Sequence, residues 1–299
     1  MATEATGPPA GDRGLGPLIQ FASEVLASAG VLTAVLYYFG YVREQALFAH
    51  FGVDLGSVGL STTDYLVRSA GPLFSPLAAV LVTGVAAVIA HHLLAYLLSR
   101  ANHRWRRIAW VALGAIALVL LAVGAVGAVS LRRGSDTLTD PLISPVALGV
   151  GALLLEYATE NARTHKAVPE QLSTGLASTR HLRRALVVSL ALVAAFWATA
   201  NVAQQHGITA ARAIESSLLI QPQAIVYSRD RLHITGPGVG QEPLSGSDAA
   251  FIFRYNGLRT LVHTGGLWFL LPAGWRHDNG ATVILLPDSR NDIRVELAP

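Results

Sequence analysis

The sequence predicts an α-helical membrane bundle followed by a small C-terminal all-β or β-rich soluble domain. The chain of 299 residues has a mean hydropathy of +0.45 and only 14% charged residues, whereas soluble domains carry about a quarter. Several apolar runs are long enough to cross a bilayer, which takes roughly 17–25 residues. Towards the C-terminus the pattern changes to short alternating segments separated by turn residues, which is typical of strands.

Five membrane-spanning helices are predicted, at residues 18–42, 72–98, 108–131, 141–157 and 185–203. The first run is interrupted by Glu24, and the fourth is short and ends on Glu156. The Pro- and Gly-rich N-terminus lacks the features of a cleavable signal peptide. The predicted organisation is therefore a disordered tail at 1–16, a transmembrane domain at 17–205 and an extracytoplasmic β-rich domain at 206–299.

Basic residues in the loops predict the orientation, because cytoplasmic loops carry the excess of Lys and Arg. One set of connections carries ten basic residues: Arg13, Arg100, Arg104, Arg106, Arg107, Arg163, Lys166, Arg180, Arg183 and Arg184. The opposite set carries four: Arg43, Arg68, Arg132 and Arg133. We therefore expect a multi-pass plasma-membrane protein with a cytoplasmic N-terminus. This topology signal accounts for the basic residues, and no nucleic-acid partner is expected.

The connection after the first span predicts two short helices. Residues 44–51 form one candidate, closed by Gly52, and the capping-box residues Ser61 and Asp64 begin another. Aromatic residues at the end of the first span are typical of a membrane interface. We favour two helices lying on the membrane surface, and the alternative is a lid over a cavity in the bundle.

Six or seven short strands are expected in the C-terminal region, and together they would form a compact sandwich or barrel. The clearest hairpin turns at Thr264-Gly265-Gly266, and the Gly/Pro/Ser stretch 236–248 is expected to be an exposed loop. The predicted strands are 224–228, 232–235, 251–255, 258–263, 267–271, 282–286 and 293–297.

Four polar residues lie within or at the ends of the predicted spans and are candidates for function: Glu24, His91, His92 and Glu156. Glu24 and the two histidines fall at similar depths, so a pair is geometrically feasible, and ionisable residues in spans often mark ion or proton routes. The other interpretation is a purely structural pair. Trp275, which follows a Pro-Ala-Gly turn, is a candidate surface contact.

No catalytic residue, metal site or cofactor is expected. The sequence has no cysteine, which excludes disulfides and Cys-ligated metal centres. It also lacks the Gly-x-Ser-x-Gly elbow, the Walker-type phosphate loop and the His-Glu-x-x-His metal motif. The composition excludes a soluble enzyme, and the high hydrophobicity excludes a disordered chain.

Two motif regions carry a resemblance. The stretch from Tyr38-Phe39-Gly40-Tyr41 through Phe51-Gly52-Val53-Asp54 to residues 60–66, together with Leu271-Pro272-Ala273-Gly274-Trp275, resembles uncharacterised multi-pass membrane proteins of high-GC bacteria. The resemblance implies a bacterial inner-membrane protein and transfers no catalytic residue.

The function expected from these observations is that of a non-enzymatic, membrane-anchored recognition or signalling/scaffold protein. Residues 206–299 would bind a protein or envelope partner, lipid would surround the helices, and a homo-oligomer remains open. The alternative is an ion- or proton-coupled channel or transporter component that uses Glu24 with His91 or His92.

Overall fold

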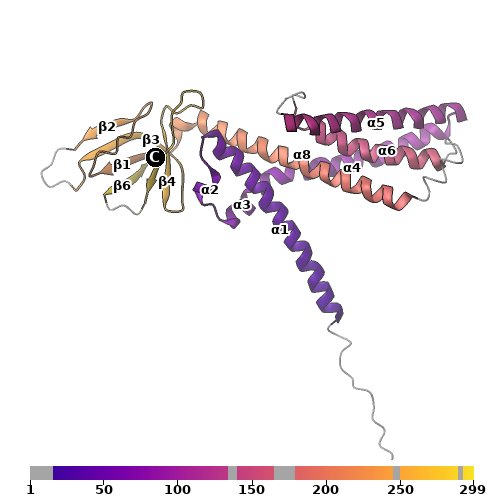
Figure 1. Ribbon diagram of the computed structural model, residues 1–299, viewed down its shortest axis with the longest axis horizontal. Coiled ribbons are helices and arrows are strands. Elements are labelled where there is room, and N and C mark those ends of the chain that lie inside the picture. The colour runs from indigo at the N-terminus through magenta and orange to yellow at the C-terminus, as the bar shows by residue number, and fades with distance from the viewer. Residues whose placement is uncertain (1–15, 134–139, 165–178, 245–249, 289–291) are drawn as a thin grey trace, which may run out of the picture.

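A helical region followed by one antiparallel sheet makes up the computed structural model (Figure 1). The structure describes residues 16–133, 140–164, 179–244, 250–288 and 292–299, and of residues 16–28, 72, 131–133 and 163–164 it describes the backbone alone. In this part of the chain the helices are α1 (Gly16–His50), α2 (Leu55–Val58), α3 (Thr62–Arg68), α4 (Ala70–Ser99), α5 (His103–Arg133), α6 (Ile143–Thr164), α8 (Arg180–Ser216) and the 3-10 turn η1 (Leu218–Ile220). The predicted combination of a helical region and a β domain is confirmed.

Three helices are long and apolar enough to cross a membrane among the described residues: Leu73–Ser99, His103–Ser130 and Arg180–Ser216. They match the predicted spans 72–98, 108–131 and 185–203. The prediction of five spans is thus confirmed for three only. α6 carries Glu156 and Glu160 in its last turns, which shortens its apolar part, and much of the run 18–42 falls on residues whose side chains are not described.

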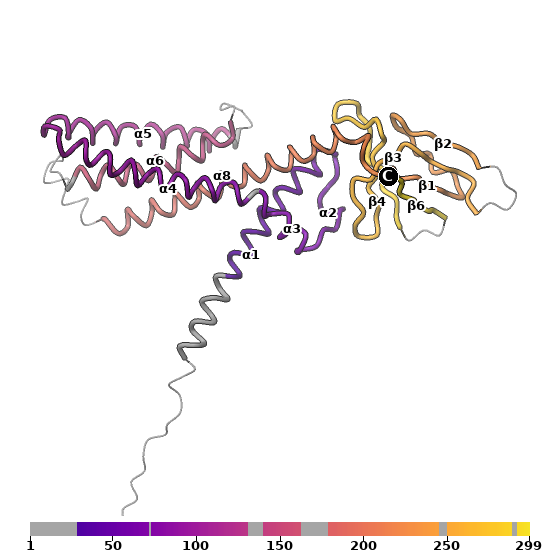
Figure 2. The backbone as a smooth tube through the Cα atoms, turned by 180° about the vertical axis from the view of Figure 1, so that it is seen from behind, coloured from indigo at the N-terminus to yellow at the C-terminus, as the bar shows by residue number. Residues whose placement is uncertain are grey.

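The four helices α4, α5, α6 and α8 run side by side in alternating directions (Figures 1 and 2). Asn201 of α8 donates from its side-chain amide to the carbonyl of Pro141, just before α6, over 2.6 Å. Near the other end of both helices Arg183 of α8 contacts Glu156 of α6. α5 and α6 are antiparallel as well, because Gly124 of α5 lies against Leu148 and, further along α6, Gly151 lies against Leu121. Small residues between membrane helices allow such close contacts.

α8 continues well beyond the predicted end of its span at residue 203. Its 37 residues correspond to about 55 Å at 1.5 Å per residue, and the helix reaches the sheet before it ends at Ser216 (Figure 1). Ala203, Gly207 and Ala211 recur every four residues and are buried. This stripe packs against the C-terminal half of α1, so the helix persists where the sequence had suggested the start of the β region.

The helix predicted at 44–51 is the last part of α1, which runs unbroken to His50. Gly52 follows in the left-handed conformation with φ of 72°, as is common after a helix end. The predicted capping box is confirmed at the start of α3, where Ser61 and Asp64 each accept a hydrogen bond from the backbone N–H of the other.

α2 and α3 form a layer between α1 and the sheet. Leu55, Val58 and Tyr65 are buried in one hydrophobic cluster with Phe269 and Leu271 of the sheet. Leu55, Val58 and Tyr65 therefore face protein, whereas Val67 of α3 is 70% exposed; the membrane-surface and lid interpretations stay predictions.

The sheet contains β1 (Gln223–Ser228), β2 (Gly240–Pro243), β3 (Phe253–Thr264), β4 (Leu267–Pro272), β5 (Ile284–Pro287) and β6 (Ile293–Ala298). The strand order is β5-β4-β3-β1-β6, and β2 pairs with β3. The predicted hairpin is confirmed, with Gly265 and Gly266 at φ of 57° and 72° between β3 and β4, as a type I′ turn requires.

The other strand predictions are confirmed in part. The single long strand β3 replaces the two strands predicted at 251–255 and 258–263. It begins at Phe253, and a bulge interrupts its pairing with β1. β2 lies within the predicted loop 236–248, and residues 232–235 form no strand. Pairing with β3 explains β2, whose own residues carry no strand-like alternation.

The two faces of the sheet have different neighbours. On one face Ala224, Val226, Tyr255, Leu258 and Leu270 form a core within the sheet domain. On the other face Phe269 and Leu271 of β4 pack on the ends of α1 and α8. β4 is therefore buried on both faces, and the helical region and the sheet share one hydrophobic core.

Gly207 sets the distance between α8 and α1. A Cβ atom at this position would lie 2.8 Å from the Cβ of Ala46 and closer still to the carbonyl of Arg43. Only glycine therefore allows the two helices to cross this closely.

We predict that Gly207→Ala lowers the free energy of unfolding by about 1–3 kcal/mol, because one extra methyl group forces the helices apart. Thermal unfolding in detergent, followed by tryptophan fluorescence, measures the change. The matched control is Gly84→Ala on α4, where a Cβ meets nothing within 4 Å, so its stability should stay equal or rise by up to about 1 kcal/mol. Equal effects of the two variants would contradict the close crossing.

Candidate functional site

The ends of α1 and α8 meet the turn after β4 at a polar junction formed by His50, Glu215 and His277. Glu215 lies in the last turn of α8. Its Oε2 is 2.8 Å from Nε2 of His50, and its Oε1 accepts the backbone N–H of His277 over 3.1 Å. The carboxylate of α8 thus holds both α1 and the sheet domain.

A third hydrogen bond closes the junction, between Nδ1 of His277 and the backbone carbonyl of His50 at 2.8 Å. A carbonyl and an ionised carboxylate can only accept. We therefore assign protons to Nδ1 of His277 and Nε2 of His50. The two imidazole rings stack 4.5 Å apart with 13° between their planes, so the junction fixes ring orientation as well as the backbone.

An apolar wall lies directly beside the junction. The Trp275 ring is 4.8 Å from that of Phe51, and its indole N–H donates to the carbonyl of Ala281 over 2.8 Å. Trp275 is 4% exposed, so its side chain is not available as the surface contact that the sequence had suggested. The Pro-Ala-Gly turn places it under the end of α1 instead.

A second polar group, formed by Glu44, Arg43 and Arg68, fixes α3 on α1. It lies about two helical turns before His50. The Glu44 side chain is 0% exposed and pairs with Arg43 and with Arg68, whose Nη1 is 2.6 Å from Oε2. Burying a carboxylate costs free energy unless it is paired and hydrogen-bonded. Two guanidinium groups meet that condition here, and the Arg68 contact ties the last turn of α3 to α1.

The capping box and a tyrosine cluster support the position of α3. Hydrogen bonds from the side chain and backbone of Ser61 hold the pKa of Asp64 below its ordinary value. Burial, with smaller contributions from the neighbouring Tyr37 and Tyr41, raises the pKa of the Tyr65 hydroxyl. Tyr65 remains a neutral packing residue at physiological pH, and its ring lies 5.1 Å from that of Tyr37.

The four polar residues predicted for the spans are not brought together as one site among the described side chains. Glu24 lies among the side chains that are not described, so its pairing with a histidine stays a prediction. His91 is 2.7 Å from the Tyr157 hydroxyl through Nδ1, and His92 is exposed beside it. Glu156 accepts hydrogen bonds from Arg183 and also pairs with Arg184, which joins the ends of α6 and α8.

Sequence reasoning missed the junction entirely. His50, Glu215 and His277 are separated by 165 and 62 residues along the chain, so no local motif could connect them. The one usable signal in the sequence was Glu215 at the end of a long helix. It was not recognised, because the helix was predicted to end at residue 203.

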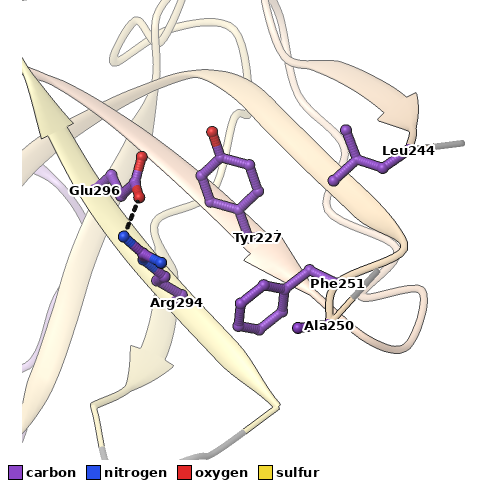
Figure 3. Close-up of a pocket in the computed structure, with 6 residues that line it drawn as sticks. All are labelled: Tyr227, Leu244, Ala250, Phe251, Arg294 and Glu296. Carbon is purple, nitrogen blue, oxygen red and sulfur yellow. Dashed lines mark ion pairs between the residues drawn. The ribbon is translucent and has the colours of Figure 1, made fainter. Parts of the chain in front are cut away.

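A hollow of about 310 Å³ lies at the far end of the sheet domain (Figure 3). Tyr227 of β1 and Arg294 and Glu296 of β6 form its floor, and Leu244, Ala250 and Phe251 line the rest.

Among the described residues, no three His, Asp or Glu side chains converge as ligands for a metal ion. Hydrogen bonds and ring stacking join His50, Glu215 and His277. No protein-family model, curated protein or solved structure matches the chain.

We predict that Glu215→Gln lowers the free energy of unfolding by about 1–2 kcal/mol, because an amide cannot accept on both sides from His50 and His277. Chemical unfolding in detergent measures this change. Glu242→Gln is the matched control, since Glu242 is exposed and its pair with Arg254 spans 3.5 Å; it should change stability by no more than about 0.5 kcal/mol. A junction variant as stable as this control would show that the hydrogen bonds contribute nothing.

Proposed function

We propose that the chain is a non-enzymatic integral membrane protein of the recognition or signalling type, whose helices hold an extracytoplasmic β domain in a fixed orientation. The observation that carries the proposal is the Glu215 junction. α8 reaches from the membrane bundle to the sheet without a break, and Glu215 at its end binds both α1 and the turn after β4. A partner bound to the β domain would therefore act on two membrane helices directly.

The proposal includes five membrane crossings. α5 and α8 both run towards the sheet, so the chain must cross back between them, and α6 supplies the return. Its 22 residues correspond to about 33 Å, and Glu156 and Glu160 in its last turns pair with Arg183 of α8, so the charged end of α6 is neutralised within the bundle. α1, with 35 residues, is long enough to provide the first crossing.

Lipid is the partner proposed for the outer surface of the bundle. None of the most apolar window of α4 is buried inside the chain. Its exposed side chains include Phe74, Leu77, Val80, Leu81, Val85 and Ile89. Such a surface would be unstable in water and fits the hydrocarbon core of a bilayer.

The charge distribution supports a cytoplasmic N-terminus. Arg100, Arg104 and Arg106 lie at the connection between α4 and α5, at the end of the bundle remote from the sheet. Arg180 lies at that same end. Arg43 and Arg68 lie near the sheet, and both form ion pairs with Glu44. This excess of positive charge supports a cytoplasmic position for the remote end.

Cysteine labelling tests this orientation, because the chain has no cysteine of its own. We predict that Thr235→Cys, exposed in the sheet domain, reacts with a membrane-impermeant maleimide on intact spheroplasts. Asn102→Cys, exposed between α4 and α5, should react only after permeabilisation. The reverse pattern would place the β domain in the cytoplasm and overturn the proposed recognition of an external partner.

A further inference from the structure

β6 forms one edge of the sheet, and within the described residues only β1 pairs with it. The backbone N–H of Arg229 donates to the carbonyl of Asp292, which sets the alternation along β6. Asp292, Arg294 and Glu296 direct their backbone groups at β1, so those of Ile293, Val295 and Leu297 point outwards. This edge offers three N–H and three C=O groups to another strand.

The side chains on this edge alternate in polarity and in sign. Ile293, Val295 and Leu297 are apolar, while Arg294 and Glu296 between them are 64% and 40% exposed and pair with each other at 2.7 Å. An exposed pair of this kind contributes little stability. A neighbouring strand could therefore replace it with cross-strand pairs of opposite charge, which are favourable on a sheet.

From this geometry we infer that the outer edge of β6 binds an extended segment of a partner protein as an added antiparallel strand. The segment carries an acidic residue opposite Arg294, a basic residue opposite Glu296 and apolar residues between them. The inference rests on the proposed function, because it assigns the partner-binding surface of the external domain. Backbone hydrogen bonds would supply affinity, and alternate side chains would supply specificity.

The hollow adjoins the same face of the edge. Tyr227 lies directly across from Arg294 in the register of β1 and β6, and Figure 3 shows both side chains with Glu296 at the hollow. Among the described residues the Tyr227 hydroxyl has no hydrogen-bond partner. The acidic residue opposite Arg294 can therefore accept from this hydroxyl as well as from the guanidinium.

A second copy of the chain would satisfy the charge pattern of the β6 edge, but the two helical bundles could not lie in the same bilayer. Read in reverse, the β6 sequence Ile-Arg-Val-Glu-Leu is itself the complementary strand. However, β1 leads away from the end of α8 and β6 returns towards it, since Gln223 lies opposite Ala298. An antiparallel copy would direct its helices the opposite way, outside the shared bilayer. A parallel copy would oppose like charges, so the occupant is a different polypeptide.

The test uses a fluorescent peptide with the sequence of residues 292–299, Asp-Ile-Arg-Val-Glu-Leu-Ala-Pro, and the full chain in nanodiscs. Fluorescence anisotropy measures the dissociation constant. The control peptide has its Arg and Glu exchanged, which places like charges opposite Arg294 and Glu296. We expect it to bind about tenfold more weakly. The protein variant Arg294→Glu/Glu296→Arg should reverse this preference.

Leu297→Pro tests the backbone contribution. It removes an outward N–H at a side chain that is 54% exposed, while the hydrogen bonds to β1 stay intact. Peptide binding should fall by about tenfold or more with an unchanged melting temperature. Equal binding of both peptides to every variant would overturn the inference. Self-association in nanodiscs that Leu297→Pro abolishes would also overturn it, in favour of a second copy.

The inference and the proposed function fail separately. If neither peptide binds but Thr235→Cys is labelled from outside, the assignment of the β6 edge as the binding surface fails. The proposal of an external recognition domain then still stands. If the labelling pattern is reversed, the proposed function fails whatever the peptides do.

Discussion

The carboxylate of Glu215 is the constraint on which the rest of the molecule depends. It lies at the end of α8, which reaches from the bundle to the sheet, and it accepts hydrogen bonds from two other segments. The stacked rings of His50 and His277 also fix the orientation of the two imidazole planes relative to each other. Hydrophobic packing alone is not directional, so these polar contacts are what specify a single orientation of the sheet on the helices.

The shared hydrophobic core supplies the stability that this orientation needs. Phe48, Phe51, Leu218, Phe269 and Leu271 join the ends of α1, η1 and β4 in one cluster. Close backbone contacts at Gly40 and Gly207 bring α3 and α8 against α1. Glu44 then holds α3 against α1 through its ion pairs with Arg43 and Arg68. The apolar contacts and the ion pairs thus act on the same few segments.

The sequence predicted those features that depend on local physics. Apolar runs predicted the helices at 72–98, 108–131 and 185–203, and the Ser61–Asp64 spacing predicted the start of α3. The Gly265-Gly266 pair predicted the β3–β4 hairpin, where both glycines have positive φ. The remaining features depend on contacts between distant segments. The extension of α8 to Ser216 needs α1 as a neighbour, the burial of Trp275 needs the end of α1 above it, and the junction joins residues from three separate elements.

A direct measurement of the junction's rigidity tests the central claim. Spin labels at Gln205→Cys on α8 and Glu242→Cys on β2, both exposed, report the distance between helix and sheet by pulsed electron resonance in liposomes. A junction that fixes the β domain gives one narrow distance distribution, which broadens when Glu215 is replaced by Ala. A distribution that is already broad in the otherwise unaltered chain would contradict the account.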